Sequence, residues 1–222
     1  MAKVIMIGGG KGGVGKSTVA IALMDYVLST GDTVSLVESD NSNPDVYKTI
    51  NKLDVECIIS NLDDESGFIK LGRYIEDHPD STIIVNTAAR ATENLITYSS
   101  MLSDVVAETG HDLIMLWPIN RQRDSLELLS DFVEKADGYS STYAVINTYF
   151  GTEEKFSRFS NSKLKNNLTG TIVFPELNDL IADKLVDGRL PIDTTSGMSI
   201  AEKSALGRYR RDAHTALKVI HG

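Results

Sequence analysis

The sequence GKGGVGKST at residues 10–18 lies between a short apolar run and a stretch with helical spacing. Residues 10–17 match the pattern G-x-x-x-x-G-K-[ST], which requires a strand before it and a helix after it. Glycines permit positive φ angles, so that successive backbone N–H groups turn toward one anion, and the helix adds the positive end of its dipole. We predict a phosphate-binding loop formed by Gly12, Gly13, Val14, Gly15, Lys16, Ser17 and Thr18.

Three side chains of this loop have distinct predicted roles. Lys16 is expected to reach the terminal two phosphates of ATP, and the Ser17 hydroxyl to bind the Mg²⁺ that bridges them. Thr18 falls in the first helical turn, near the α-phosphate. The predicted ligands are therefore ATP or ADP with Mg²⁺. The alternative, a glycine-rich turn without a ligand, is disfavoured by the strand and helix around it.

The rest of the chain predicts an α/β fold. Short β-branched runs recur between helical segments, a pattern typical of parallel strands buried on both faces. The predicted strands are residues 4–7, 33–37, 82–85, 113–116, 143–146 and 171–174, and the predicted helices are 16–29, 123–136 and 199–220. We expect residues 1–222 to form one domain with a doubly wound, mostly parallel sheet flanked by helices.

Two segments do not follow this pattern. Residues 41–72 show no clear periodicity, and no element is predicted there. Residues 151–169 are rich in Ser, Asn, Lys and Glu, and we expect them to form a surface excursion with a polar helix.

Composition excludes several classes of protein. With a net charge of −9 and a pI near 4.9, the chain is not expected to coat nucleic acid or anionic membrane with its whole surface. Cys57 is the only cysteine, so no internal disulfide and no C-x-x-C site can form. Apolar runs long enough for a membrane span and the features of a signal peptide are absent from the sequence. We therefore expect a cytoplasmic protein.

The second lysine of the loop carries a family resemblance. The sequence KGGVGKST at residues 11–18 resembles the deviant Walker A motif of the ParA/MinD family of ATPases, whose signature lysine matches Lys11. The resemblance implies an ATP-dependent homodimer in which Lys11 of one subunit reaches the phosphates bound to its partner. There it would stabilise the transferred charge during ATP hydrolysis.

The sequence VESD at residues 37–40 stands where the family usually carries D-x-D, and Asp40 matches the second carboxylate. A carboxylate at the end of a strand beside the phosphate loop can orient the attacking water or hold a metal-bound water. Asp40 is therefore predicted to be catalytic and to contribute to the Mg²⁺ site. Glu38 departs from the usual Asp by one methylene. The alternative is that both acids only open the turn continued by residues 41–44.

Asn86 replaces an aspartate of the family at the end of the strand 82–85. A neutral amide can bind a magnesium-bound water, but it does not attract the cation by charge. Weak Mg²⁺ binding or slow turnover is the hypothesis that follows. Arg90 stands near the family's switch glycine, and we expect it on the surface, with an approach to the γ-phosphate as the alternative.

Two later positions resemble the family's base-binding residues. Asn147, at the end of the strand 143–146, matches an Asn that reads adenine, because an amide can pair with a donor and an acceptor on one purine edge. Pro175 and Glu176 resemble the loop that flanks the base. By itself, Asn147 could equally be a turn former.

The C-terminal segment allows three interpretations, two of which involve an external partner. Arg208, Arg210 and Arg211 could bind DNA phosphates without sequence specificity, whereas membrane docking would need a large apolar face. The third alternative is a final helix packed on the sheet with solvated arginines. DNA is favoured over membrane as the external partner.

The leading functional hypothesis is an ATP-driven dimerisation switch. ATP and Mg²⁺ join two subunits, hydrolysis through Lys11, Lys16 and Asp40 separates them, and a partner protein stimulates the slow reaction. The chain resembles the short ParA type, which serves plasmid partition and conjugal transfer. A P-loop small-molecule kinase or ligase, with its substrate over residues 41–72, and a catalytically idle nucleotide-binding adaptor are the alternatives.

Overall fold

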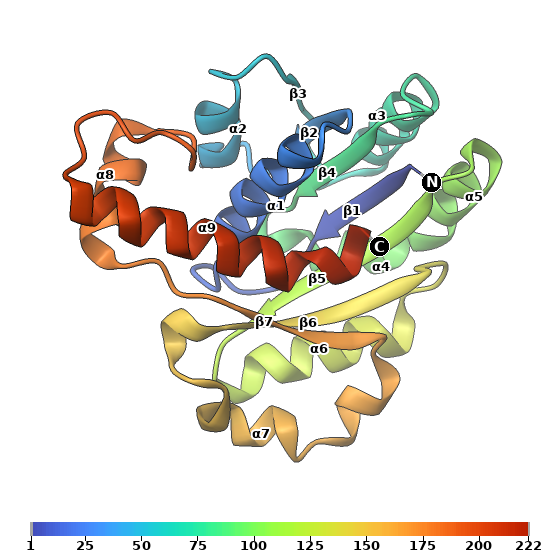
Figure 1. The fold of residues 1–222 in the computed structure, drawn as a ribbon. Coiled ribbons are helices and arrows are strands. Elements are labelled where there is room, and N and C mark those ends of the chain that lie inside the picture. Colours follow the sequence, from blue (N-terminus) through green and yellow to red (C-terminus); the bar gives the residue numbers. More distant parts are fainter. Residues whose placement is uncertain (1, 222) are drawn as a thin grey trace.

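The computed structural model describes residues 2–221, and its centre is one seven-stranded sheet (Figure 1). Every pair of neighbouring strands is parallel, and the strand order is β3-β2-β4-β1-β5-β6-β7. The strands are β1 (Lys3–Ile7), β2 (Val34–Glu38), β3 (Glu56–Ile59), β4 (Thr82–Asn86), β5 (Asp112–Ile119), β6 (Ser141–Asn147) and β7 (Gly170–Phe174). The predicted doubly wound α/β fold and its six predicted strands are confirmed.

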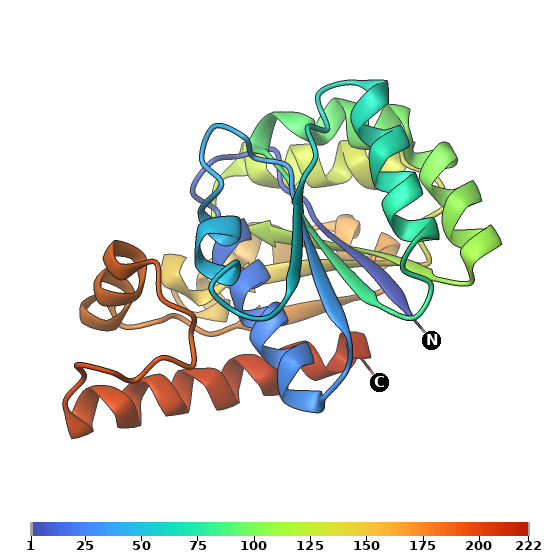
Figure 2. The same cartoon turned by 90° about the horizontal axis from the view of Figure 1, so that it is seen from above.

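Helices cover both faces of the sheet. They are α1 (Lys16–Thr30), α2 (Asp45–Ile50), α3 (Glu65–Glu76), α4 (Thr92–Thr97), α5 (Ser99–Thr109), α6 (Arg123–Lys135), α7 (Ser157–Ser160), α8 (Asp179–Gly188) and α9 (Ile200–His221). Short 3-10 turns are η1 (Ala89–Ala91), η2 (Thr148–Phe150), η3 (Glu153–Phe156) and η4 (Lys163–Asn167). Figure 2 shows α1 and α9 on one face, with α3, α5 and α6 on the other. Two buried apolar clusters lie on the two faces.

The segment 41–72, for which no element was predicted, contains α2, β3 and the start of α3. β3 lies at the edge of the sheet, and its four residues are exposed or half-buried. An edge strand therefore needs no continuous apolar run, which explains the absence of a pattern. The α3 helix begins after Asp64, whose side chain accepts a hydrogen bond from the Gly67 N–H at 3.0 Å.

The segment 151–169 lies at the surface, as the sequence predicts, but three of its side chains anchor it to the core. It forms η3, α7 and η4, and its apolar side chains Phe156, Phe159 and Leu164 are buried in the cluster that contains Phe132. Because polar residues outnumber these three, the composition of the segment does not reveal that its apolar side chains are buried. The segment is therefore part of the layer that covers β6.

The α9 helix packs on the sheet, as one of the three alternatives proposed. Gly207 does not interrupt the helix, and the five apolar residues that recur at helical spacing are buried: Leu206, Tyr209, Ala213, Leu217 and Ile220. Arg210 forms a two-pronged ion pair with Asp25 of α1, at 2.9 and 2.7 Å. Arg210 is therefore a structural contact between α1 and α9, which corrects its predicted role as a surface cation for DNA. Across residues 2–221, the structure contains no helix that combines the length and the apolar character needed to span a bilayer.

Candidate nucleotide site

The phosphate-binding loop connects the central strand β1 to α1. After β1 the chain builds the sheet toward β2 and β3, and later extends it on the other side through β5, β6 and β7. Ligands of open parallel sheets bind at such a reversal, outside the carboxyl ends of the strands. Gly13 and Gly15 have φ values of 75° and 102°, which only glycine adopts without strain. Gly15 is also the N-cap residue of α1, so the loop leads directly into the helix N-terminus.

Lys16 lies inside this loop. Its Nζ donates to the carbonyl oxygens of Gly9 and Lys11, both at 3.0 Å, and the residue is 9% exposed. Burial lowers the pKa of Lys16 to about 8, while the nearby charge of Asp40 raises it. A buried cation that contacts only neutral carbonyl oxygens fits an anionic ligand, because a phosphate would compensate its lost hydration.

Lys11 points elsewhere. Its Nζ forms an ion pair with Asp124 in the first turn of α6, and its side chain is one-third exposed. The two lysines of the loop are therefore separated: Lys16 is buried in the cradle, and Lys11 lies at the rim. No local pattern in the sequence marks Asp124 as a partner of Lys11, since 113 residues separate them.

The ends of β2 and β4 meet at a buried pair, Glu38 and Asn86. Asn86 Nδ2 donates to Glu38 Oε1 at 2.9 Å, and the two residues are 0% and 2% exposed. The backbone N–H groups of Asp40 and Tyr47 also donate to the Glu38 carboxylate, at 3.0 and 3.4 Å. Burial nevertheless raises the pKa of Glu38 to about 7, and these hydrogen bonds oppose the shift. Asn86 Oδ1 is buried and has no donor among the described residues.

Asp40 closes a turn and remains close to Lys16. Its Oδ1 accepts from the backbone N–H groups of Ser42 and Asn43, both at 3.2 Å. The turn-forming alternative therefore describes its local contacts correctly. The residue is only half-buried, and its charge acts on Lys16, so the turn holds a carboxylate beside the phosphate-binding loop.

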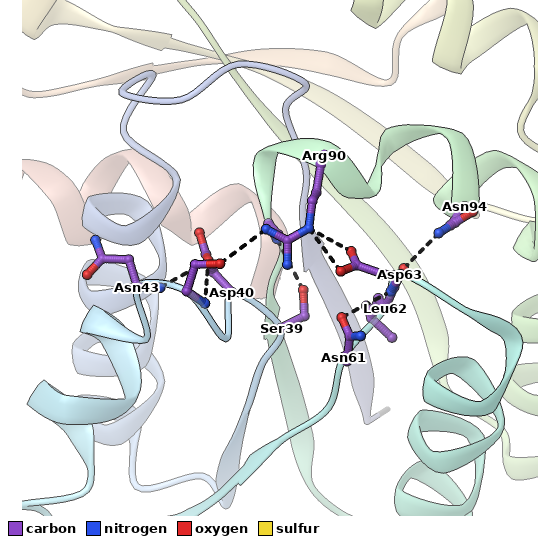
Figure 3. A network of polar contacts seen from close by, with 10 residues as sticks. Ser39, Asp40, Asn43, Asn61, Leu62, Asp63, Arg90 and Asn94 are labelled. Atoms are coloured by element: carbon purple, nitrogen blue, oxygen red, sulfur yellow. Dashed lines mark hydrogen bonds and ion pairs between the residues drawn. The ribbon is translucent and has the colours of Figure 1, made fainter.

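Arg90 lies on the surface, as expected, but it is not a freely solvated side chain. Its Nε donates to both carboxylate oxygens of Asp63, at 3.0 and 2.9 Å, and its Nη1 donates to Ser42 Oγ at 3.3 Å. Figure 3 shows Arg90 between the loop of Asp40 and the loop of Asp63. Arg90 thus links the segments that follow β2, β3 and β4. Sequence reasoning missed Asp63, which follows β3 at the unrecognised edge of the sheet.

The predicted base-binding residues gather at one cavity of about 310 Å³ beside the loop. Asn147 Nδ2 donates to the Val14 carbonyl oxygen at 3.0 Å, and Asn147 Oδ1 accepts from the Tyr149 N–H at 3.1 Å. The amide therefore ties β6 to the phosphate-binding loop. The phosphate-binding loop contributes Gly13, Gly15, Ser17 and Thr18 to the cavity wall. The predicted base-binding residues contribute Asn147, Pro175 and Glu176.

Helices α8 and α9 and the turn that follows α8 supply the apolar wall of the same cavity, which the sequence did not reveal. Leu185, Leu190 and Tyr209 lie there, and the Tyr209 hydroxyl has no hydrogen-bond partner among the described residues. A mainly apolar wall with a few polar groups at the loop suits a base attached to phosphates.

The oxygen ligands expected for Mg²⁺ are sparse but compatible with that ion. Across residues 2–221, no group of three or more His, Cys, Asp or Glu side chains could hold a metal. Mg²⁺ commonly keeps several waters and takes only one or two protein ligands together with phosphate oxygens. Ser17 at the cavity, Asp40 near Lys16 and the unpaired Asn86 Oδ1 fit that requirement.

Comparison with protein families matches residues 5–196 to the CobQ/CobB/MinD/ParA nucleotide binding domain. The chain belongs to this family. Protein MobD of Acidithiobacillus ferrooxidans is 39% identical, and the match covers 100% of both chains. The family resemblance inferred from Lys11 and the loop is therefore confirmed.

Two solved structures of the family share the fold. MinD from Pyrococcus horikoshii, complexed with Mg-ADP, has a TM-score of 0.59 at 17% identity, covering 100% of this chain and 98% of that chain. A protein from Borrelia burgdorferi B31 assigned to plasmid partition, bound to AMPPNP, has a TM-score of 0.58 at 20% identity over 99% and 100% of the two chains. Nucleotide and Mg²⁺ binding thus occur within the family.

Proposed function

We propose that this protein is an ATP-binding and ATP-hydrolysing switch that dimerises with ATP and Mg²⁺ and separates after hydrolysis. The observation that carries the proposal is the separation of the two loop lysines. Lys16 is buried in the cradle, whereas the Lys11 side chain lies at the rim and forms an ion pair with Asp124. Lys11 is thus a second cation beside the phosphate-binding loop that its own cradle does not use. This position supports a role for Lys11 across a subunit interface.

The remaining residues of the site take the roles that their chemistry allows. Lys16 binds the terminal phosphates, and Asp40 orients the attacking water. Ser17 and Asp40 hold Mg²⁺, which when bound offsets the charge of the phosphates. Asn147, Pro175 and Glu176 flank the base at the cavity wall.

Turnover is proposed to be slow and stimulated by a partner protein. Asn86 carries no charge toward the Mg²⁺ site, and the nearby Glu38 carboxylate is already occupied by three donors. Such a site binds nucleotide without efficient hydrolysis until its loops are rearranged. Membership of the family that includes ParA and MinD, and a fold shared with a protein assigned to plasmid partition, support a role in DNA partition, transfer or positioning, which we propose to take place in the cytoplasm.

One observation favours a small-molecule kinase or ligase as a second candidate. A polar cleft of about 880 Å³ lies between α2 and the end of α8, and it shares Asp45 and Arg189 with the nucleotide cavity. Three cations line it, Lys48, Lys52 and Arg189, against the two carboxylates Asp45 and Asp187, so an anionic small molecule would be compatible with its charge. Product release stimulated by such a molecule, without dimerisation, would favour this candidate.

The deciding measurement is molar mass by light scattering, without nucleotide, with ADP and with ATP·Mg²⁺. We expect a dimer only with ATP·Mg²⁺ in the wild type, a longer-lived dimer for Asp40→Ala, and a monomer for Lys11→Ala. Nucleotide binding is measured in parallel, because Lys11→Ala should retain it and Lys16→Ala should lose it. A wild-type protein that stays monomeric in every state would overturn the switch. ATP binding without turnover, even with a partner, would indicate the idle adaptor.

A further inference from the structure

Arg90 contacts two loops other than its own at the carboxyl edge of the sheet. It lies in η1, after β4. Its Nε donates to both carboxylate oxygens of Asp63, in the loop after β3, at 3.0 and 2.9 Å. Its Nη1 donates to Ser42 Oγ, in the loop after β2, at 3.3 Å. The guanidinium is therefore held from two directions, between Asp63 and the turn of Asp40 (Figure 3).

Ser42 connects Arg90 to the Asp40 carboxylate. The Ser42 N–H donates to Asp40 Oδ1 at 3.2 Å, while the Ser42 hydroxyl accepts from Arg90. The Asn43 N–H donates to the same carboxylate oxygen, also at 3.2 Å. Both backbone bonds are at the long end of the normal range, so the turn by itself holds the carboxylate weakly. A restraint on Ser42 therefore affects how well Asp40 is placed.

The chain before Asp40 is fixed, whereas the chain after it is not. Ser39 is 1% exposed, and its Oγ accepts from the Ala88 N–H at 3.1 Å, which ties the end of β2 to the segment after β4. Residues 41–43 are exposed and contribute no side chain to the core. Arg90 thus acts on the part of the turn that the core does not hold.

The other partner of Arg90 is anchored on both sides. Leu62 is 1% exposed, and its carbonyl oxygen accepts from Asn94 Nδ2 at 3.2 Å. Asp64 caps α3 by accepting from a backbone N–H of that helix at 3.0 Å. Asp63 lies between these two residues, so its carboxylate is a fixed point from which Arg90 reaches the Asp40 turn (Figure 3).

We propose that Arg90, oriented by Asp63, is a positioning residue that holds Asp40 beside the phosphate-binding loop through Ser42. The inference rests on the proposed function, because Asp40 is the carboxylate proposed to orient the attacking water. Arg90 acts on Asp40 and not on the nucleotide, since its Nε and Nη1 are engaged by Asp63 and Ser42. Loss of such a contact lowers kcat and leaves nucleotide affinity unchanged.

The first test compares Arg90→Gln, Ser42→Ala and the double variant in ATP hydrolysis and in nucleotide binding at equilibrium. We expect each single variant to lower kcat by about five- to tenfold and to change KM by less than about twofold. The double variant should lose no more than the larger single loss, because both changes break one contact. Lys135→Gln, which removes the same charge and an exposed ion pair with Asp131 on α6, is the control and should leave kcat unchanged.

A second pair of variants tests the orienting role of Asp63. Asp63→Asn removes the charge that pairs with Arg90, whereas Asp63→Glu keeps a carboxylate that can accept from it. We expect Asp63→Asn to lower kcat by about threefold and Asp63→Glu to stay within about twofold of the wild type. Melting temperatures should change little, because the two side chains are 51% and 34% exposed.

Hydrogen exchange tests the restraint separately from hydrolysis. The backbone N–H groups of residues 42 and 43 are followed by NMR without nucleotide. Arg90→Gln should raise both exchange rates by at least about threefold, because the turn opens more often, whereas Lys135→Gln should leave them unchanged.

Three outcomes would overturn the proposal. Unchanged exchange in Arg90→Gln would show that Arg90 does not restrain the turn. Additive losses of kcat in the double variant would show that Arg90 and Ser42 act separately. A loss of ATP affinity relative to ADP of about tenfold or more in Arg90→Gln, but not in Ser42→Ala, would identify Arg90 as a direct ligand of the γ-phosphate. A wild type that binds ATP without hydrolysing it would reject the proposed function, while faster exchange in Arg90→Gln would still support the restraint on Asp40.

Discussion

The two sides of the candidate site are built in different ways. The phosphate-binding loop is one continuous stretch, in which the backbone and Lys16 form the cradle. The other side lies at the carboxyl ends of β2 and β4 and depends on Glu38 and Asn86. These two residues are 48 positions apart and meet only because the strands are adjacent. A contiguous motif is visible as a pattern, whereas a pair across two strands is visible only once the strands are placed.

The two departures from the family pattern, at positions 38 and 86, are linked in the structure. Considered separately, Glu38 in place of Asp and Asn86 in place of Asp are two weakened positions. In the structure they are one hydrogen-bonded pair, with a carboxylate on β2 and an amide on β4. Asn86 is therefore the partner that lets a buried Glu38 stay in place. Aspartate at position 86 would not simply restore the family's Mg²⁺ site.

The largest effect is expected from a substitution that disrupts the Glu38–Asn86 pair. Asn86→Asp places two carboxylates in contact in a site that excludes water, and should cost about 3–5 kcal/mol of unfolding free energy at pH 8. The double variant Glu38→Gln/Asn86→Asp exchanges the two groups and should recover most of the loss. Urea denaturation measures both. A single Asn86→Asp variant as stable as the wild type would show that the pair is not coupled.

The second largest effect is expected at Gly15 of the phosphate-binding loop, with Gly12 of the same loop as the control. A Cβ at Gly15 would lie 2.3 Å from Asn147 Nδ2, at a φ of 102°, whereas a Cβ at Gly12 meets nothing within 4 Å. Gly15→Ala should therefore cost about 2–3 kcal/mol and weaken nucleotide binding. Gly12→Ala should change stability by less than about 0.5 kcal/mol. Similar melting temperatures for the two variants would argue against a strained cradle.

A smaller effect concerns pH. The folded pKa of Glu38, about 7, lies above its ordinary value of 4.5, so the folded state binds more protons than the unfolded state between these values. Stability should therefore fall as pH rises from 5 to 8, by about 2 kcal/mol, and level off above the folded pKa. Glu38→Gln carries no titrating group and should remove this fall. Parallel stability curves for the two proteins would assign the pH dependence to other groups.

The smallest effect on stability concerns the contact that joins the loop to α6. The Lys11–Asp124 ion pair is exposed, so Asp124→Asn should leave the melting temperature unchanged. Its effect should be on assembly: a released Lys11 lets the ATP-dependent dimer form at lower protein concentration. Asp131→Asn, which removes an ion pair with Lys135 on the same helix, is the control. Equal dimerisation of both variants would contradict a restraining role for Asp124.

The sequence by itself determined the α/β class, six of the seven strands, and the phosphate-binding loop with Lys16. These features follow from local properties: the spacing of apolar residues reflects burial on two faces of a sheet, and glycine positions reflect the backbone angles of the loop. Family membership was also predictable, because Lys11 belongs to the same contiguous motif. Asn147, Pro175 and Glu176 were placed by resemblance, and the structure brings them to one cavity with the loop.

Only the tertiary structure decided the remaining contacts. The edge strand β3 has no continuous apolar pattern, and the burial of Phe156 in the segment 151–169 is concealed by its polar neighbours. The partners of Lys11, Arg90 and Arg210 are likewise distant in the chain. The physical reason is that an ion pair or buried hydrogen bond depends on which elements the fold brings together, and the period of a single segment contains no information about its neighbours in space.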